Sequence, residues 1–209
     1  MSVNNTSLLL ENKNLSTLEI TENFTCIRFL DQNKEKFELE FNLEKGTSFN
    51  TFLIISKDEL SIIHPPEKEY SESINQVISN FHDEFKFNKI NIITGHVNPK
   101  IIATIKSISL KFSNLAITCS NPGSKLISEL WNQKNPKLET FIEQELPKIN
   151  IVKKELNLEL ENISLKLLPV ATARWPGGLI VYEENQEILL SEKIFSAHLA
   201  SVELSLIHI

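Results

Sequence analysis

Three short segments hold the side chains of this chain whose types could do chemistry together: residues 96–101, 174–176 and 193–195. The first begins with the imidazole of His96, but positions 98, 100, 174 and 193 hold asparagine, lysine, arginine and lysine. Lysine and arginine only donate hydrogen bonds and carry positive charge, so they cannot coordinate a cation. The residue types by themselves therefore disfavour a metal site here.

The histidines give no further support for a metal site. A single histidine in a loop is more often structural or exposed than a ligand. The remaining histidines form no HxH or HxxxH pair; they are His64, His82, His198 and His208. The residue pattern therefore predicts that His96 is structural or exposed and does not bind a metal.

The other two segments also have ordinary interpretations. Residues 174–178 fit a hairpin turn with Trp175 packed on a sheet as well as they fit the loop of a site. Lys193 is expected to be a solvated lysine after a strand, and Glu192 an ordinary surface acid. Neither segment identifies a function by itself.

Composition limits the class of protein. With 209 residues and 41% hydrophobic content, the chain can bury enough surface for one substantial domain. Its net charge of -6 and pI near 5.5 argue against a general nucleic-acid role. Residues 1–10 have no basic region of a secretory signal, and no apolar run reaches the roughly 20 residues of a membrane span. Cys26 and Cys119 are far apart in sequence, which fits a reducing cytoplasm.

The first half of the chain reads as strands followed by a helix. Alternation predicts a half-buried strand at 37–41, and continuous apolar runs predict strands at 52–55 and 60–64 after a turn at Gly46. From 71 to 85 the apolar residues recur every three or four positions, as in an amphipathic helix. These elements are spaced like hairpins leading into a helix.

The middle reads as two strand–helix units. Strands are predicted at 89–94 and 115–119, a helix at 99–112, and a second helix capped by Ser120 or Asn121. The candidate core contacts of the first helix are Ile102, Ile105, Ile108 and Leu110. Residues 96–100 therefore lie in a strand-to-helix loop, where sites commonly gather.

The last part returns to strands. Residues 133–150 are polar and interrupted by proline, which predicts a surface excursion containing a short helix. Alternation then predicts four strands, at 155–160, 163–167, 179–182 and 188–190. Hairpins, then βα units, then hairpins indicate an α/β (α+β) fold with a mixed sheet and helices on its faces.

Taken together, these residues resemble the N-terminal metallo-β-lactamase-like domain of flavodiiron proteins, in particular the cyanobacterial diflavin flavoproteins. Residues 25–28, 37–41 and 46–54 are similar to the entry strands of that family, including its Gly-Thr-aromatic-Asn turn. Residues 174–176 and 190–198 are similar to its HWPD and FSxDxFG segments. The resemblance implies an αββα sandwich that is incomplete at its C-terminal end.

The resemblance also implies where diiron ligands would stand. In the family they come from an HxExDH loop, the histidine of HWPD, the aspartate of FSxDxFG and a later histidine. Residue by residue, these positions hold His96, Asn98, Lys100, Arg174 and Lys193, and only His96 keeps a ligand type. Two accompanying positions, the second histidine of the loop and the aspartate of HWPD, hold Ile101 and Gly177. The expectation is a pocket that keeps the frame of a two-metal site and has lost the metal.

The charge of these replacements forms a pattern. Relative to the family's ligands they add six positive charges, about the charge that two iron ions would bring. Buried cations need partners, because an unpaired buried charge costs several kcal/mol. We therefore expect a bound anion, ordered water or internal acids around Lys100, Arg174 and Lys193, or an open wet pocket.

The resemblance implies a function for the longer protein. The family passes electrons from NAD(P)H through FMN to diiron and reduces oxygen to water, in head-to-tail dimers. We expect the lactamase-like domain at 21–200 after a lead at 1–20, a non-family tail at 201–209, and no FMN or flavin-reductase domain within this chain. The expected protein is a cytoplasmic subunit of a homodimer, or of a heterodimer with a ligand-complete paralogue.

Two other classes of function stay open. The cationic pocket could bind a small anion or the acidic loop of a partner, which would make the chain a non-catalytic assembly or binding module. Hydrolysis, as in the wider lactamase superfamily, is disfavoured because that chemistry needs a metal-activated water.

Overall fold

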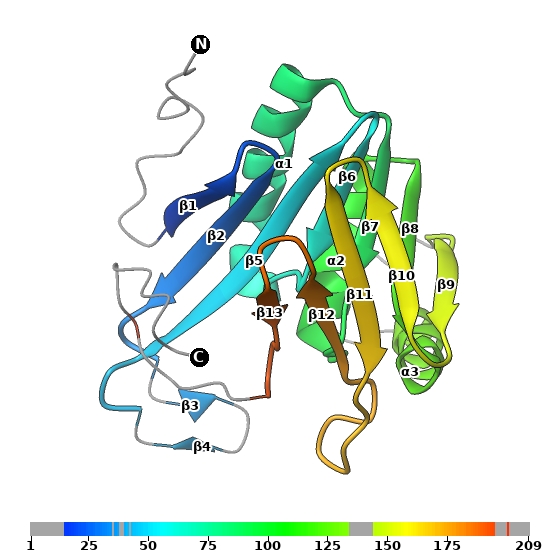
Figure 1. Cartoon of the computed structure of the whole chain (residues 1–209). Helices are drawn as coiled ribbons and strands as arrows, with labels where there is room; N and C mark the ends of the chain where they lie inside the picture. Colours follow the sequence, from blue (N-terminus) through cyan, green and yellow to red (C-terminus); the bar gives the residue numbers. More distant parts are fainter. Residues whose placement is uncertain are drawn as a thin grey trace.

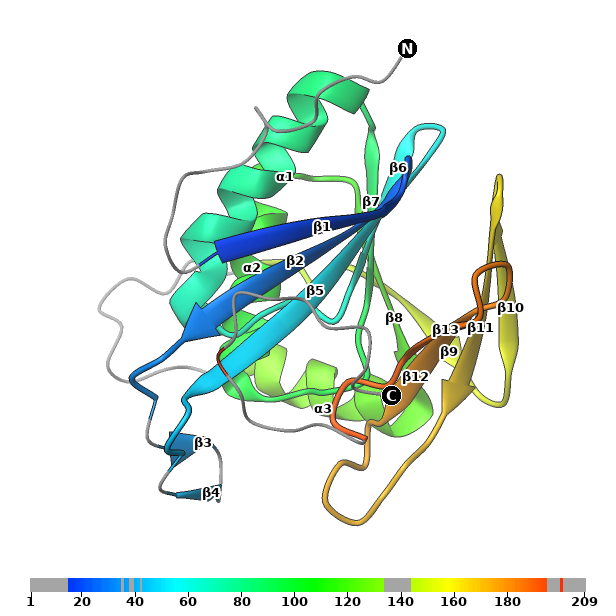
Figure 2. The same cartoon turned by 60° about the vertical axis from the view of Figure 1, so that its left-hand side comes forward.

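The fold is described from a computed structural model. It covers residues 15–34, 43–133, 144–194 and 200, together with the backbone at 36–37 and 40–41. Within these residues two sheets pack face to face, and helices cover the outer face of the larger sheet (Figures 1 and 2). The predicted mixed α/β architecture of the metallo-β-lactamase type is confirmed.

The larger sheet has seven strands in the order β1-β2-β5-β6-β7-β8-β9. Its first four strands are antiparallel, whereas β6 to β9 are parallel to one another. The strands span Leu15–Thr21 (β1), Phe24–Asp31 (β2), Thr47–Ser56 (β5), Glu59–Ile63 (β6), Lys89–Ile93 (β7), Leu115–Ser120 (β8) and Lys148–Val152 (β9). The sheet thus begins at Leu15, inside the segment predicted as an N-terminal lead.

The smaller sheet is an antiparallel meander in the order β10-β11-β12-β13. Its strands span Leu156–Leu160, Ile163–Pro169, Leu179–Glu183 and Ile188–Leu190. All four were predicted from alternation. One face of this sheet packs on the larger sheet through residues such as Leu165, Leu167 and Val181, which are fully buried.

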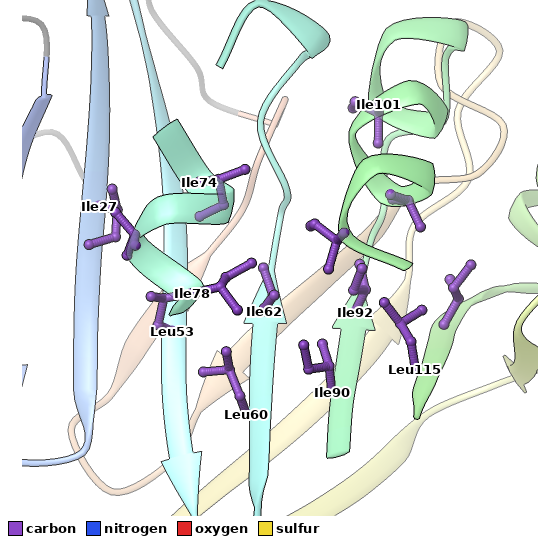
Figure 3. Close-up of a cluster of buried hydrophobic side chains, with 14 of the residues drawn as sticks. Ile27, Leu53, Leu60, Ile62, Ile74, Ile78, Ile90, Ile92, Ile101 and Leu115 are labelled. Atoms are coloured by element: carbon purple, nitrogen blue, oxygen red, sulfur yellow. The ribbon is translucent and has the colours of Figure 1, made fainter. Parts of the chain in front are cut away.

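The helices pack on the opposite face of the larger sheet (Figure 2). They are α1 (Ser71–Phe85), α2 (Pro99–Lys111) and α3 (Asn121–Asn132), and the short 3-10 helix η2 (Lys68–Tyr70) precedes α1. Figure 3 shows isoleucines and leucines of β2, β5, β6 and β7 meeting those of α1 and α2 in one cluster. This cluster fixes the strands whose ends carry the candidate site.

Local sequence explains where these helices begin. Asn98 caps α2 by accepting a hydrogen bond from the Ile101 amide at 2.8 Å, and Ser120 caps α3 by accepting one from the Gly123 amide at 3.2 Å. A proline follows each cap at the first or second helical position. Ser120 is therefore the cap, of the two candidates predicted.

Three sequence predictions need correction. Leu110 is 59% exposed, because it lies off the face of α2 that buries Ile101, Ile105 and Ile108. The single strand predicted at 37–41 is instead two short antiparallel strands, β3 (Lys36–Phe37) and β4 (Glu40–Phe41). β9 lies partly within the predicted surface excursion at 133–150. It is the parallel edge strand beside β8, and the predicted helix falls largely outside the described residues.

Candidate functional site

The three segments singled out in the sequence meet at one end of the β-sandwich. His96 follows β7, Arg174 and Trp175 belong to the loop between β11 and β12, and Lys193 follows β13. His96, Trp175, Glu192 and Lys193 line one small pocket, which has room for about one water molecule. We call it the histidine pocket. Asn98 lies against His96, whereas Lys100 is directed elsewhere, toward η2.

Tight backbone packing places the His96 loop. A side chain at Gly95 would clash with the backbone of Leu179 at the start of β12, so only glycine lets the two segments approach this closely. The Thr94 hydroxyl then donates to the His96 carbonyl at 2.8 Å. The result is a buried imidazole, 7% exposed, in a fixed position at the end of β7.

Both side-chain atoms of the Asn98 amide make hydrogen bonds. Its Oδ1 caps α2, and its Nδ2 lies 3.1 Å from His96 Nε2 and 3.4 Å from Glu67 Oε1. Because an amide nitrogen only donates, the contact to His96 requires Nε2 to be the acceptor, with the imidazole proton on Nδ1. Asn98 thus orients His96 and connects it to Glu67.

Glu67 is the central acid of the site, and the sequence analysis missed it. It follows the Pro65-Pro66 turn at the end of β6 and is only 4% exposed. Its carboxylate accepts hydrogen bonds from Lys34 Nζ at 3.3 Å and Lys100 Nζ at 3.2 Å, besides the contact from Asn98. We call Lys34, Glu67, Glu69, Asn98 and Lys100 the Glu67 cluster. From the sequence, only the general requirement that buried cations have acids nearby indicated that such a residue exists.

Lys100 is paired with acids of η2. Its ammonium forms ion pairs with Glu67 and Glu69, and its side chain is about half exposed (48%). Burial by itself would lower the pKa of Lys100, but the hydrogen bond to Glu69 and the charge of Glu67 raise it above its ordinary value. Burial likewise opposes ionisation of Glu69, yet the hydrogen bond from Lys100 lowers its pKa overall. Lys100 is therefore held as a cation outside the histidine pocket.

A second buried imidazole, His64, lies next to Glu192, which lines the histidine pocket. Its Nε2 is 3.3 Å from the Leu190 carbonyl, and its Nδ1 is 3.7 Å from Glu192 Oε2. Burial lowers the pKa of His64 to about 4; the hydrogen bond to Leu190 opposes the shift, and the charges of Lys193 and His96 add to it. His64 is therefore neutral near pH 7. The Glu192 side chain is only 14% exposed, so its prediction as an ordinary surface acid is wrong.

The remaining cations rest on aromatic rings. The Arg174 guanidinium lies over the ring of Trp175 at 4.8 Å, and Arg174 itself is exposed. The ammonium groups of Lys34 and Lys193 lie 4.9 Å and 5.7 Å from the centre of the Phe49 ring. Such cation–π contacts hold a charge where water is partly excluded. Phe49 and Lys34 gave no sequence signal, because their roles depend on contacts between distant segments.

These side chains do not fit a pair of iron ions. Iron sites are built from imidazole, carboxylate and thiolate ligands, and of the five predicted positions only His96 offers one. Asn98 is committed to the helix cap and to His96. Within the part of the chain that the structure describes, no three His, Cys, Asp or Glu side chains are grouped so that they could hold a metal ion.

The two accompanying positions have structural surroundings. Ile101 is 4% exposed in the core under α2. The Gly177 carbonyl accepts a hydrogen bond from the Ser120 hydroxyl at 2.8 Å, which ties the loop between β11 and β12 to the start of α3.

Comparison with known proteins identifies the family. The family model described as ODP family beta lactamase matches residues 47–208. The chain belongs to this family. Curated relatives of this ODP member include diflavin flavoprotein A 6 of Nostoc sp. strain PCC 7120, 30% identical over 188 residues, and diflavin flavoprotein A 1 of Synechocystis sp. strain PCC 6803, 24% identical over 192 residues. Each match covers 90% of this chain but only 30% and 31% of the relative, so the chain spans about a third of their length.

Solved structures agree with the ODP assignment. The metal-soaked Flv1 flavodiiron core from Synechocystis sp. PCC6803 is 26% identical, with a TM-score of 0.73 over 90% of this chain and 44% of that one. A diflavin flavoprotein A 5 fragment from Nostoc sp. PCC 7120 is also 26% identical, with a TM-score of 0.72 over 90% and 69%. The rubredoxin oxygen:oxidoreductase of Desulfovibrio gigas, 18% identical with a TM-score of 0.73 over 90% and 43%, shares the fold. The resemblance to flavodiiron proteins is thus confirmed.

Among the described residues of this ODP-family chain, no helix is long and apolar enough to cross a membrane.

Proposed function

We propose that this chain is the lactamase-like part of a cytoplasmic flavodiiron-type oxidoreductase subunit whose own metal pocket is iron-free. The complete protein would take part in NAD(P)H-dependent reduction of oxygen to water, with FMN held outside this chain. The observation that carries the proposal is the Glu67 carboxylate, which accepts from Asn98 and Lys100, residues at two former ligand positions. Ligand positions that serve an internal ion-pair cluster cannot also hold metal.

The acids of the Glu67 cluster bear on the positive charge that lysine and arginine add at the ligand positions. From the sequence, the added cations were expected to replace the charge of two iron ions. In the structure, acids accompany the cations, so the region is close to electrically balanced. The cations are Lys34, Lys100, Arg174 and Lys193, and the acids are Glu67, Glu69 and Glu192. The site therefore supports a self-contained polar cluster more than a cationic pocket awaiting an anion.

Such a site suits a subunit that contributes to assembly and electron routing. The hydrogen bonds and ion pairs that Glu67 accepts from Lys34, Asn98 and Lys100 hold these segments in one arrangement, which suits a docking surface. We infer that the subunit works in a dimer, either with itself or with a ligand-complete paralogue that supplies the diiron chemistry.

The alternative is a non-catalytic module that binds an anion or a partner. One observation favours it: Arg174 is exposed, and its guanidinium lies over the ring of Trp175, a residue that lines the histidine pocket. Exposed arginine is well suited to pair with a carboxylate or phosphate. In this alternative, Arg174 and not Lys100 would be the binding residue.

The test uses the full-length gene co-expressed with a ligand-complete relative. The variants Lys100→Asp, Arg174→His and Lys193→Asp, singly and together, would be measured for iron content, heterodimer formation and NAD(P)H-driven oxygen uptake. Lys166→Asp is the charge control, because Lys166 pairs with Glu184 on the smaller sheet.

The proposal expects substoichiometric iron in the unmodified subunit, and loss of the dimer or of oxygen uptake in the triple variant. Two irons per unmodified subunit bound at this site would refute it. Unchanged oxygen uptake in every folded variant would remove any direct redox role of the pocket. If Arg174→His alone abolished binding of a partner or anion, the alternative would hold.

A further inference from the structure

The two sheets of the sandwich each end in an edge strand on the same side of the molecule. β9 is the last strand of the larger sheet and β10 is the first strand of the smaller one, and residues 153–155 join them (Figure 1). Within the described residues, no other strand pairs with the outer side of β9 or of β10. Each edge therefore leaves backbone N–H and C=O groups available to a further strand. We call residues 148–161 the edge pair.

The edge pair also exposes apolar side chains. Ile151 of β9 is 44% exposed and Leu156 of β10 is 42% exposed. They are two of the four large apolar side chains that are this exposed in the described part of the chain. Single exposed apolar residues are ordinary, but two of them beside unpaired backbone on adjacent edges favour a surface that a partner covers.

The two edges carry opposite charges. The charged residues are Lys148, Lys153 and Lys154 on the β9 side, and Glu155, Glu159 and Glu161 on the β10 side. All six are exposed, and the ion pairs among the described residues involve none of them. Lysine on an edge strand is by itself an ordinary protection against association. An adjacent edge with acids is different, because it gives those lysines a matching surface on a second copy of the chain.

A two-fold axis parallel to the strands brings the opposite charges together. The chain reverses direction between β9 and β10 (Figure 1), so this axis places β9 of one copy antiparallel to β10 of the other, and does so twice in the dimer. An axis perpendicular to the strands would instead place β9 against β9 and β10 against β10, with like charges opposed. The charges therefore select the first arrangement.

The turn between the edges sets the register of this pairing. Val152 and Leu156 flank its three residues and lie at about the same level, which the two-fold axis keeps. Val152 of one copy then opposes Leu156 of the other, and Lys153 opposes Glu155. Side-chain direction agrees, because Val152 and Leu158 both pack in the core between the sheets. Lys153 and Glu155 are each one position away from an inward residue, so both point outward on one face.

From these observations we infer that the edge pair is the interface between two copies of this chain, in which β9 and β10 extend each other's sheets. The inference goes beyond the proposed function and does not rest on it. No residue of the edge pair belongs to the histidine pocket or to the Glu67 cluster. A dimer formed here requires neither FMN nor iron.

Charge reversal followed by sedimentation equilibrium of the 209-residue chain tests the interface. Lys153→Glu with Lys154→Glu makes both edges acidic, and Glu155→Lys with Glu159→Lys makes both basic. Each double variant should dimerise at least about tenfold more weakly than the unmodified chain, whereas an equimolar mixture of the two should form a heterodimer. The matched control reverses Lys111 and Lys125, exposed lysines of α2 and α3, and should dimerise as the unmodified chain does.

Cysteine cross-linking tests the pairing of unlike edges. In the inferred register position 151 opposes position 157 of the other copy, so Ile151→Cys and Asn157→Cys chains should form a disulfide when mixed and not separately. The native thiols do not compete, because Cys26 and Cys119 are buried and burial raises the pKa of each to about 12.

Four results would each overturn the inference. They are a monomer at every concentration, unchanged dimerisation of both charge-reversed variants, no heterodimer in their mixture, and cross-links within either single-cysteine variant. Iron content is measured on the same samples. Two bound irons in a chain that dimerises as expected would refute the proposed function and leave this interface standing.

Discussion

Glu67 and Glu183 are both buried glutamates at the ends of strands, yet their surroundings differ. Glu67, beyond the end of β6, accepts from two ammonium groups and an amide. Glu183, at the end of β12, accepts only from two backbone amides beside a cavity. The first acid is neutralised by ammonium groups of its own chain, whereas the second is held by neutral donors in a turn. A buried acid by itself therefore indicates no function; its partners do.

The largest expected effect is at Glu67. Glu67→Ala leaves the Lys34 and Lys100 ammonium groups without their shared acceptor, and removing one partner of a buried ion pair typically costs about 3 kcal/mol or more. Urea unfolding of the variant should show a loss of this size. Glu69→Ala is the control: its half-exposed pair should contribute less than about 1 kcal/mol. Equal losses in the two variants would mean that burial of Glu67 has no special importance.

Acid should lower the free energy of unfolding of the chain because His64 is buried in its neutral form. Its pKa is about 4 in the folded chain and 6.5 ordinarily, so between these values the unfolded chain binds more protons. Stability is therefore lost as pH falls from about 6.5 to about 4, by roughly 3 kcal/mol. Asparagine tolerates the left-handed backbone at position 64. In the variant His64→Asn, the free energy of unfolding should therefore depend less on pH between pH 7 and pH 4. The control variant His82→Asn should keep the dependence of unfolding free energy on pH, because His64 is still present. If His64→Asn kept the same dependence, His64 would not be its source.

A smaller loss is expected at Glu183. In Glu183→Gln the side-chain NH2 cannot accept from a backbone amide, so one of the two turn hydrogen bonds is lost, at a cost of about 2 kcal/mol. Differential scanning calorimetry would measure it. Glu184→Gln, on the partly exposed pair with Lys166, should change stability by less than about 0.5 kcal/mol.

The smallest effect separates the two uses of Asn98. Asn98→Ala loses the cap of α2 and should destabilise the chain by about 1 kcal/mol. Asn98→Ser keeps a capping oxygen but loses the contact with His96, so it should recover most of that stability in urea unfolding. Its His96 resonances should nevertheless shift as in the alanine variant. If serine recovered nothing, the contact with His96 would be the more important one.

Local patterns predicted most of the scaffold. Period-three-to-four spacing identified α1, and alternation identified the four strands of the smaller sheet. The errors occurred where a local pattern has two solutions. Alternation at 37–41 fits one strand or the two arms of a hairpin, and the edge strand β9 is short and mostly exposed. Leu110 has the composition of a core residue but lies off the buried face of its helix.

The candidate site was only partly predictable, for a different reason. His96 and Asn98 belong to one loop, so their neighbourhood follows from the chain itself. Glu67 lies 33 residues before Lys100, and Lys34 lies 33 residues before Glu67. Nothing in the local sequence connects these three residues. Only the general need of a buried cation for an acid predicted that such partners exist.

The sequence by itself determined the elements, the family resemblance and the chemical limits of the five positions, because backbone preferences and side-chain types are local properties. It already settled that lysine and arginine at 100, 174 and 193 cannot be metal ligands. The tertiary structure decided which acids neutralise Lys100, that Lys100 is directed to η2 and not into the histidine pocket, and that Glu183 is held by two backbone amides. Pairing between distant charges depends on strand order and on which loop ends meet, and a sequence pattern does not contain that information.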